Sequence, residues 1–398
     1  MDTLKQKIKD KAGQYKSSII SFRRHIHTFP ELSKKEHQTA AFVEKQLGNI
    51  GVPCERMADT GVIGLIHGKT PGKTIALRAD MDALPVTEAN THDFVSQNRG
   101  VMHACGHDAH TAVLLGAAQI LQEFRAHFAG RIVLIFQPSE ENLPGGAKEL
   151  LEEGLFHKYK PAKIIGLHTD PELHSGTIGM KAGEYMASTD EIYLHVKGKG
   201  GHGAMPDKNT DTVLIASQIL VSLQQVVSRE SPPALPAVLS FGRFIADGQT
   251  NIIPDHVKID GTFRTFDESW RVQAHQRIRE IADYTARAHR GECEVLIKKG
   301  YPCLVNDEHF TAQVFQYAQG FLGREQVLEL PVRMTAEDFA YYAQQIPACF
   351  FRLGIRNEAK GITANLHTST FDIDEASLET GTGIMSWLAM ESLGNESG

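Results

Sequence analysis

The sequence lacks the features that mark secreted, membrane-spanning and nucleic-acid-binding proteins. Its 398 residues include only five cysteines, odd in number and widely spaced, so we expect no disulfide framework and a reducing cytoplasm. No apolar run reaches 18 residues, which argues against a membrane span, and the charged N-terminus lacks the apolar core of a secretion signal. Lys and Arg number 41 against 48 Asp and Glu, and this net charge of −7 argues against nucleic acid as a partner.

The chain length and the pattern of elements predict an α/β protein. A chain of this length exceeds the roughly 100–200 residues of one domain, so two domains are expected. Short apolar strands at 74–77, 132–136 and 164–167 alternate with helices such as one at 109–126. This alternation predicts a sheet with helices on both faces.

A second pattern begins near Gly183 and predicts an inserted domain. Alternating apolar and polar residues at 191–196 start a strand–helix–strand–strand–helix–strand succession, typical of a small one-sided sheet. The α/β pattern then resumes. We therefore predict a catalytic domain of residues 1–182 and 299–398, interrupted by residues 183–298.

Two local signals predict helices. Ser33 followed three residues later by Glu36 has the form of a capping box, which opens a helix in the next stretch of chain. A further short helix is expected at 335–345, before a strand at 349–353.

Candidate metal ligands follow the predicted strands. Asp80 and Asp82 follow the first strand, Glu140 and Glu141 the second, and His168 the third. Open α/β sheets bind ligands at these carboxyl ends of strands. The stretches HACGHDAH (103–110) and NLHTSTFDIDE (365–375) add Cys105, His107 and His367.

These residue types favour a borderline metal and a hydrolytic reaction. Thiolate and imidazole suit zinc and related ions, and a carboxylate adds a hard donor. Cys105 and His107 can reach one region from an extended loop, and Gly106 permits its close approach. Glu140 and Glu141 are expected to point apart, one to a metal and one to the attacking water. Each alone has an ordinary structural explanation, so the inference rests on their joint occurrence.

Ordered motifs along nearly the whole chain resemble the M20 metallopeptidase superfamily, in its aminoacylase-like branch. The matching stretches are RRHIHTFPELS, ALRADMDALP, MHACGHDAHTAVLLGAA, IFQPSEE, GLHT, GKGGHGAMP, TNIIPD, GTFRTF, AEDF and HTSTFDIDE. The branch includes N-acyl-amino-acid amidohydrolases, hippurate hydrolases and auxin-conjugate hydrolases. The resemblance implies a metallopeptidase-like α/β catalytic domain interrupted by a smaller α+β lid and dimerisation domain, and hence a homodimer or higher homo-oligomer.

The resemblance also implies the roles of individual residues. A pair of divalent ions (manganese, zinc, cobalt or nickel) would be held by Cys105, His107, Glu141, His168 and His367. Glu140 falls on the general base, and Asp82 falls on a carboxylate that orients a ligand. Asp80 stands where related branches carry a ligating His, so we do not expect it to bind metal. The remaining members of HACGHDAH (His103, Asp108 and His110) are expected to be structural or to support the ligands.

The inserted domain is expected to contribute to the substrate site. His202 in GGHGAMP matches a histidine that reaches the substrate carbonyl, including across a dimer interface. Asn251 and Arg264 match residues that contact the substrate carboxylate, for which the arginine fork is suited. One departure concerns the last metal histidine: the branch commonly has Pro two residues later, where this chain has Ser369.

The predicted function is metal-dependent hydrolysis of N-acyl amino acids to a carboxylic acid and an amino acid, with Glu140 as general base. Two alternatives stay open at this point. One is a dipeptidase or aminopeptidase on the same fold. The other is a homologue that binds metal without catalysis.

Overall fold

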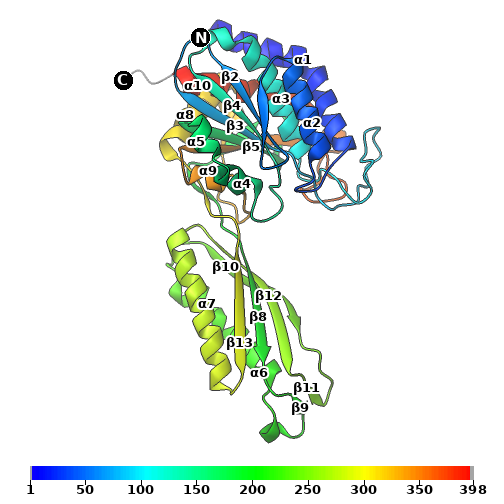
Figure 1. Cartoon of the computed structure of the whole chain (residues 1–398), viewed down its shortest axis with the longest axis vertical. Coiled ribbons are helices and arrows are strands. Elements are labelled where there is room, and N and C mark those ends of the chain that lie inside the picture. The colour runs from blue at the N-terminus through cyan, green and yellow to red at the C-terminus, as the bar shows by residue number, and fades with distance from the viewer. Residues whose placement is uncertain (1, 395–398) are drawn as a thin grey trace. The chain divides into compact units, whose positions relative to one another are not determined.

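The computed structural model describes residues 2–394, and they form two compact units (Figure 1). Within this range, unit 1 contains residues 2–183, 305–331 and 338–394, and unit 2 contains residues 184–304 and 332–337. The sequence pattern predicts segment 332–337 in the catalytic domain, whereas the structure groups it with unit 2. It groups with unit 2 because Arg333 exchanges backbone hydrogen bonds with Tyr185 and Ala187, at 2.8 and 3.0 Å.

Unit 1 is built on an eight-stranded mixed sheet. In sheet order the strands are β1 (Cys54–Met57), β2 (Gly61–His67), β4 (Arg131–Gln137), β3 (Thr74–Asp80), β5 (Lys163–His174), β16 (Ala348–Arg356), β6 (Ile178–Met180) and β15 (Val327–Glu329). Strands β4, β3, β5 and β16 run parallel to one another. Every residue of β3 is buried, as expected for a strand covered on both faces.

Helices cover both faces of this sheet, as the sequence predicted (Figure 1). One layer contains α1 (Asp2–Thr28), α2 (His37–Asn49), α3 (His107–Glu123), α8 (Glu308–Leu322) and α10 (Ala376–Gly394). Short helices follow on the other side, namely α4 (Gly146–Glu152), α5 (Leu155–Tyr159) and α9 (Ala340–Ala343). The helix expected at 335–345 is thus only four residues long, because its first residues belong to unit 2.

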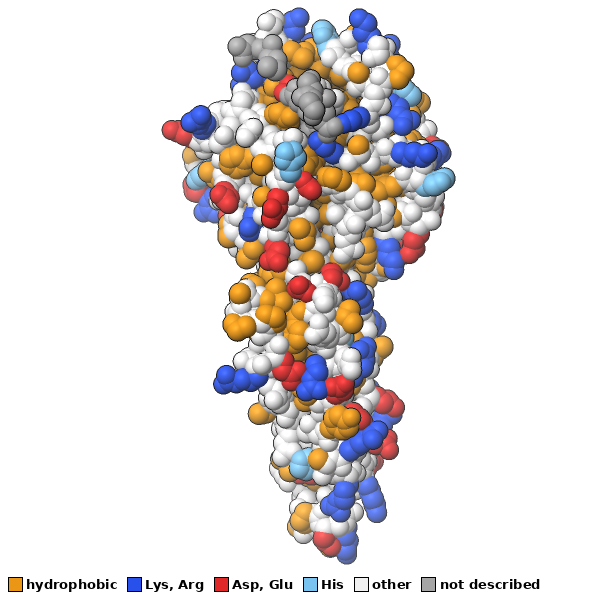
Figure 2. Space-filling model, turned by 90° about the vertical axis from the view of Figure 1, so that its left-hand side faces the viewer, with side chains coloured by type: hydrophobic (Ala, Val, Ile, Leu, Met, Phe, Trp, Pro, Cys, Tyr) orange, Lys and Arg blue, Asp and Glu red, His pale blue; other side chains and the backbone are white. Residues whose placement is uncertain are grey.

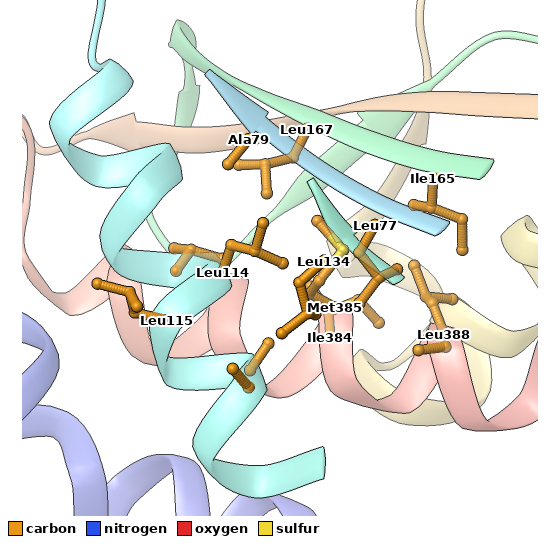
Figure 3. Packing of buried hydrophobic residues seen from close by; sticks show 14 of the residues in the cluster. Leu77, Ala79, Leu114, Leu115, Leu134, Ile165, Leu167, Ile384, Met385 and Leu388 are labelled. Atoms are coloured by element: carbon orange, nitrogen blue, oxygen red, sulfur yellow. The ribbon is translucent and has the colours of Figure 1, made fainter. Parts of the chain in front are cut away.

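The core of unit 1 lies between the parallel strands and the helices α3 and α10. Figure 3 shows Leu77 and Leu134 from neighbouring strands packed against Leu114 of α3 and Met385 of α10. Helix α3 is apolar around most of its circumference because it contacts both the sheet and helices α1 and α10. This packing holds the N-terminus of α3, where HACGHDAH lies, against the ends of the strands.

Unit 2 is a four-stranded antiparallel sheet with two helices on one face. The order is β10 (Ala237–Ile245), β12 (His256–Thr265), β8 (Asp190–Lys197) and β13 (Glu292–Lys299), and the helices are α6 (Thr212–Leu223) and α7 (Glu268–Ala288). Its core is formed by the inward residues of the alternating strands and by both helices. The remaining strands form two separate two-stranded sheets. One pairs β9 (Gly201–His202) with β11 (Ile252–Ile253), and the other pairs β7 (Gly183–Met186) with β14 (Leu304–Asn306).

The expected capping box at Ser33 is absent. Helix α2 starts at His37, and its first amides donate to the Glu31 carboxylate, from Gln38 at 2.9 Å and from Thr39 at 2.9 Å. The Ser33 hydroxyl instead donates to Asp82 at 2.6 Å. The Ser33 hydroxyl, which the local sequence predicted to cap helix α2, therefore donates to Asp82, a carboxylate distant in the sequence.

Charged side chains of both signs are interspersed on the face shown in Figure 2. Among residues 2–394, no helix is both long and apolar enough to cross a membrane.

Candidate metal centre

Three neighbouring parallel strands bring most of the predicted ligands to one edge of the sheet in unit 1. Strand β3 lies between β4 and β5, and all three end at the same edge. The segments that follow β3 and β4 hold Asp82, Glu140 and Glu141, while His168 lies within β5. The loop before α3 and the segment before α10 add Cys105, His107 and His367.

The five predicted metal ligands lie within reach of common ions. Cys105 Sγ is 3.3 Å from His168 Nε2 and 3.4 Å from His367 Nε2. Glu141 Oε1 is 3.3 Å from His367 Nε2 and 4.0 Å from His107 Nε2. Ligand atoms of Cys105, His107 and His168 also lie within 4.8 Å of one another, as do those of Cys105, Glu141 and His367. These two groups share Cys105, so the five side chains form one continuous set of possible ligands.

A close backbone contact places Cys105. Gly106 has φ of +87°, and a Cβ at this position would lie 2.5 Å from the Thr169 hydroxyl oxygen. That hydroxyl donates to the Cys105 carbonyl at 3.0 Å. Glycine is required here because the backbone is left-handed and the next strand is in contact. The loop thereby brings the Cys105 thiol to His168.

Asp82 is the organising carboxylate of the site. Its Oδ1 accepts from the Glu140 amide at 3.0 Å and lies 3.2 Å from His107 Nδ1. Its Oδ2 accepts from the Glu141 amide at 2.9 Å and from the Ser33 hydroxyl at 2.6 Å. Because a carboxylate only accepts, His107 must carry a proton on Nδ1, which leaves Nε2 for a metal.

The Glu140–Glu141 pair is not extended, contrary to the expectation from sequence. Ser139 has a left-handed φ of +55°, so the chain turns directly after β4. The turn places carboxylate oxygens of Glu140 and Glu141 within 4.8 Å of each other and of a His107 nitrogen. Both carboxylates therefore belong to the same site, and Glu140 is 94% buried there.

Two buried polar atoms of the site make no hydrogen bond. They are His107 Nε2 and Glu141 Oε1. Glu141 Oε1 faces His367 Nε2 at 3.3 Å and His107 Nε2 at 4.0 Å, and because a buried polar atom that makes no hydrogen bond is costly, a cation between these atoms would be favourable. One thiol, three imidazoles and a carboxylate form a mixed donor set that suits a divalent ion of borderline softness.

Electrostatics favour the metal-binding form of His168. Burial and the positive charge of Arg352 on β16 hold the pKa of His168 well below its usual range, so its imidazole is neutral. Its Nδ1 lies 2.7 Å from the Thr169 carbonyl, which accepts the Nδ1 proton and directs Nε2 to Cys105. By contrast, burial and the Glu141 charge raise the pKa of the Cys105 thiol. A bound cation would have to displace that proton.

The segment that carries His367 is anchored at three places despite its lack of proline. The His367 amide donates to the Ala104 carbonyl at 2.7 Å, and its backbone adopts a left-handed φ of +63°. The Ser369 carbonyl accepts from the Ala89 amide at 2.8 Å, and Asn90 Nδ2 donates to the Phe371 carbonyl at 3.0 Å. Hydrogen bonds to the loop after β3 thus restrain the segment where proline is missing.

Most of the remaining polar residues of these motifs are paired with charged or polar neighbours. Asp80 Oδ1 is 2.5 Å from His110 Nδ1, and its Oδ2 accepts from Arg78 at 2.7 Å. Asp108 accepts from Arg23 at 2.9 Å. His103 is buried, and neither ring nitrogen has a hydrogen-bond partner. Both carboxylate oxygens of Asp80 are therefore already paired, one with His110 and the other with Arg78.

The predicted substrate residues lie in unit 2. His202 is exposed on β9, and its neighbour Gly203 donates its amide to the Asn251 carbonyl at 2.8 Å. His202 and Asn251 are therefore side by side. Arg264 lies near the other end of β12 and donates to the Met334 carbonyl at 3.0 Å. Burial lowers the pKa of Arg264.

Sequence reasoning missed three supporting residues, namely Ser33, Thr169 and Arg352. Ser33 contacts Asp82, Thr169 fixes the Cys105 loop, and Arg352 sets the charge beside His168. Only Thr169, which directly follows His168 in GLHT, offered a local signal.

A parallel-sheet edge with thiolate, imidazole and carboxylate donors around a buried glutamate defines a metal-dependent hydrolase. The pattern of Peptidase family M20/M25/M40 matches residues 76–391, and the chain belongs to this family.

Relatives and a solved structure agree with this assignment. The chain is 42% identical over 303 residues to an N-acyl-L-amino acid amidohydrolase of Geobacillus stearothermophilus, covering 76% of this chain and 81% of the relative. It is 38% identical to thermostable carboxypeptidase 1 of Saccharolobus solfataricus over 98% of both chains. The crystal structure of Bacillus subtilis YXEP, a dinuclear metal binding peptidase of the M20 family, matches with a TM-score of 0.81 at 32% identity, over 96% of this chain and 99% of that one.

Proposed function

We propose that this enzyme hydrolyses the amide bond of N-acyl amino acids, using divalent ions held by five side chains of unit 1. These side chains are Cys105, His107, Glu141, His168 and His367. The observation that carries the proposal is their convergence around two buried polar atoms without hydrogen-bond partners, beside the buried Glu140. The related N-acyl-L-amino acid amidohydrolase supports the substrate class.

Glu140 is the proposed general base. The chemistry that divalent ions supply when bound is Lewis-acid activation of water and of the amide carbonyl. Glu140 accepts the proton of the attacking water and then delivers it to the leaving nitrogen. The hydrogen bond from its amide to Asp82 fixes its backbone relative to His107. Asp82 is thus a positioning residue for both the base and a ligand.

The tautomer of His202 suits its proposed role as a donor to the substrate carbonyl oxygen. His202 Nδ1 accepts a hydrogen bond from the Ala204 amide at 3.1 Å, so in neutral His202 the proton is on Nε2. An Nε2–H group can donate to an oxyanion, an interaction worth about 3–4 kcal/mol in comparable sites. The exposed position of His202 leaves it accessible to a substrate.

The positions of His202 and Arg264 within unit 2 support a dimeric enzyme. The β9–β11 pair that carries His202 follows the end of the sheet where His256 pairs with Lys197 (Figure 1). Arg264 lies eight residues further along β12 than His256, which is about 26 Å at the rise of an extended strand. One small substrate therefore cannot contact His202 and Arg264 of the same chain. We therefore propose that Arg264 and Asn251 bind substrate carboxylate in different copies of unit 2, and that His202 acts on a neighbouring subunit's site.

The names of two relatives, an N-acyl-L-amino acid amidohydrolase and a carboxypeptidase, support the proposed substrate class. An N-acyl amino acid and a peptide cut by a carboxypeptidase share one leaving group, an amino acid with a free carboxylate. A panel of acetyl-, benzoyl- and indoleacyl-amino acids beside dipeptides, each with a carboxamide counterpart, would separate the classes. We expect the N-acyl acids to be preferred over the dipeptides, and the carboxamides to react poorly. A preference for dipeptides would favour the peptidase alternative, which the carboxypeptidase relative supports.

Glu140→Gln tests the mechanism directly. We expect kcat to fall by a factor of about 10²–10⁴, because proton transfer is lost, while metal content stays equal to that of the wild type. Glu152→Gln on α4, an exposed position, is the matched control and should keep full activity. Normal activity in Glu140→Gln would refute the mechanism. A wild type that binds metal but cleaves nothing in the panel would favour the non-catalytic alternative.

We further propose that the metal is manganese, zinc, cobalt or nickel and that the enzyme works in the cytoplasm. The donor set supports the first proposal. The five free cysteines support the second, since such a site needs reduced thiols.

A further inference from the structure

Unit 1 contains a second cluster of metal-ligating side chains that shares no residue with the candidate metal centre. It consists of His27 near the end of α1 and of Glu88 and His92 in the loop after β3. Glu88 Oε1 lies 3.0 Å from His27 Nε2 and 3.4 Å from His92 Nε2. One ligand atom from each residue lies within 4.8 Å of the others. Ligands around a tetrahedral zinc ion with bonds of 2.0–2.2 Å are about 3.4 Å apart, which is close to these separations.

The orientation of His27 is that of a metal ligand. Its Nδ1 lies 2.8 Å from Asp108 Oδ2, so Nδ1 carries the proton and Asp108 accepts it. A carboxylate behind an imidazole in this way fixes the tautomer and strengthens the opposite nitrogen as a ligand. If His27 is neutral, its Nε2 lone pair faces the Glu88 carboxylate at 3.0 Å. Either a second proton or a cation must then separate the two groups.

His92 distinguishes these two possibilities. A protonated His27 bridging Asp108 and Glu88 would need no further imidazole. Yet His92 Nε2 points at the same Glu88 oxygen, and both ring nitrogens of His92 are shielded from solvent without a hydrogen bond. The ring is held in place by stacking on Phe94, with centroids 3.7 Å apart. A cation would bond to His92 Nε2, which faces Glu88 but makes no hydrogen bond.

The charge around the cluster favours a cation. Four carboxylates face two guanidinium groups in one connected network: Glu88, Asp108, Asp372 and Glu375 against Arg23 and Arg24. The network therefore has a formal charge of −2 when its histidines are neutral. A divalent ion would balance this charge. The His92 side chain is 20% exposed, so the cluster lies close enough to the surface for an ion to enter.

We propose that His27, Glu88 and His92 bind an additional divalent ion of the zinc type, with water completing its coordination. This site fastens the loop after β3 to α1. The same loop holds the segment of His367 through the Ala89 and Asn90 hydrogen bonds described above. The ion thus has a structural role next to, and separate from, the catalytic ions.

Metal counting on matched variants tests the site. The wild type, His92→Phe and Glu88→Gln are stripped with chelator, reloaded with Co²⁺, dialysed and analysed for cobalt per chain. Phenylalanine preserves the stack on Phe94, and glutamine preserves the acceptor oxygen for Asn90. His157→Phe, at an exposed position of α5, is the control. Circular dichroism verifies that each variant is folded.

We expect His92→Phe and Glu88→Gln each to bind one cobalt ion fewer than the wild type, with His157→Phe unchanged. The thiolate-to-cobalt absorption of Cys105 should persist in all of them, because the additional site has no thiolate. Equal cobalt content in the wild type and both variants would overturn the proposal in favour of a protonated His27. A loss in only one variant would overturn the three-ligand site.

Discussion

Substitution of Asp82 by asparagine tests how much of the metal centre depends on one carboxylate. Asp82 accepts two backbone amides, one hydroxyl and the Nδ1–H of His107 on its two oxygens. Asparagine replaces one of these oxygens by an NH₂ group, which cannot accept. The less costly orientation turns the NH₂ towards Ser33, whose hydroxyl can rotate and accept. The Glu141 amide then loses its partner.

The structure sets the expected size of this effect. A hydrogen bond to a charged group is worth about 1.5–3 kcal/mol, and the lost bond lies next to a metal ligand. Substitution of a group that orients a ligand costs about 10- to 100-fold in affinity or activity. We therefore expect Asp82→Asn to weaken metal binding by about 10- to 100-fold, and excess metal should restore part of the activity.

Competition with a chromophoric chelator measures the metal affinity, and kcat is measured at saturating metal. Asp59→Asn, an exposed carboxylate, is the control and should behave like the wild type. Metal affinity equal to that of the wild type in Asp82→Asn would refute the assigned role of Asp82. An affinity loss accompanied by complete unfolding would also count against it, because the reasoning predicts a local defect.

Three further perturbations have defined outcomes. Gly106→Ala should abolish metal binding or fold poorly, because its Cβ would meet Thr169 at 2.5 Å; a variant with wild-type metal content would contradict the close-approach argument. Chelation of the metal should lower Tm, since a ligand at 1,000 times its Kd stabilises by about 4 kcal/mol; an unchanged Tm would mean that the ions contribute nothing to the fold. Asp190→Asn should destabilise unit 2 by up to about 3 kcal/mol, because the buried Arg271 then keeps only Glu268, at 2.8 Å, as an anionic partner. Burial raises the pKa of Asp190, but hydrogen bonds from His275 and Arg271 outweigh burial and lower it below its usual 3.8. Its stabilisation is therefore complete above about pH 5 and lost as pH falls below 3.8, and denaturant unfolding should show a weaker acid dependence in the variant.

The local sequence pattern was sufficient to predict those secondary-structure elements that have long apolar runs. The apolar runs around Leu77, Phe136 and Leu167 predicted three buried strands, and each is present. Ser33 shows where local pattern failed. Its spacing to Glu36 indicated a helix cap, but its hydroxyl bonds to Asp82, 49 residues away. A short polar side chain bonds to the strongest available acceptor, which the local sequence does not reveal.

The sequence by itself determined which residue types are available for metal chemistry and which strands carry them, because buried strands and their polar ends leave a pattern within a few residues. Only the tertiary structure decided that Cys105, separated by more than 60 residues from His168 and by 262 from His367, contacts both. It also decided that Ser139 turns the Glu140–Glu141 pair into one site, and that His27 and His92 share Glu88. Such contacts depend on the order of strands in the sheet and on backbone turns, and both result from packing of the whole unit.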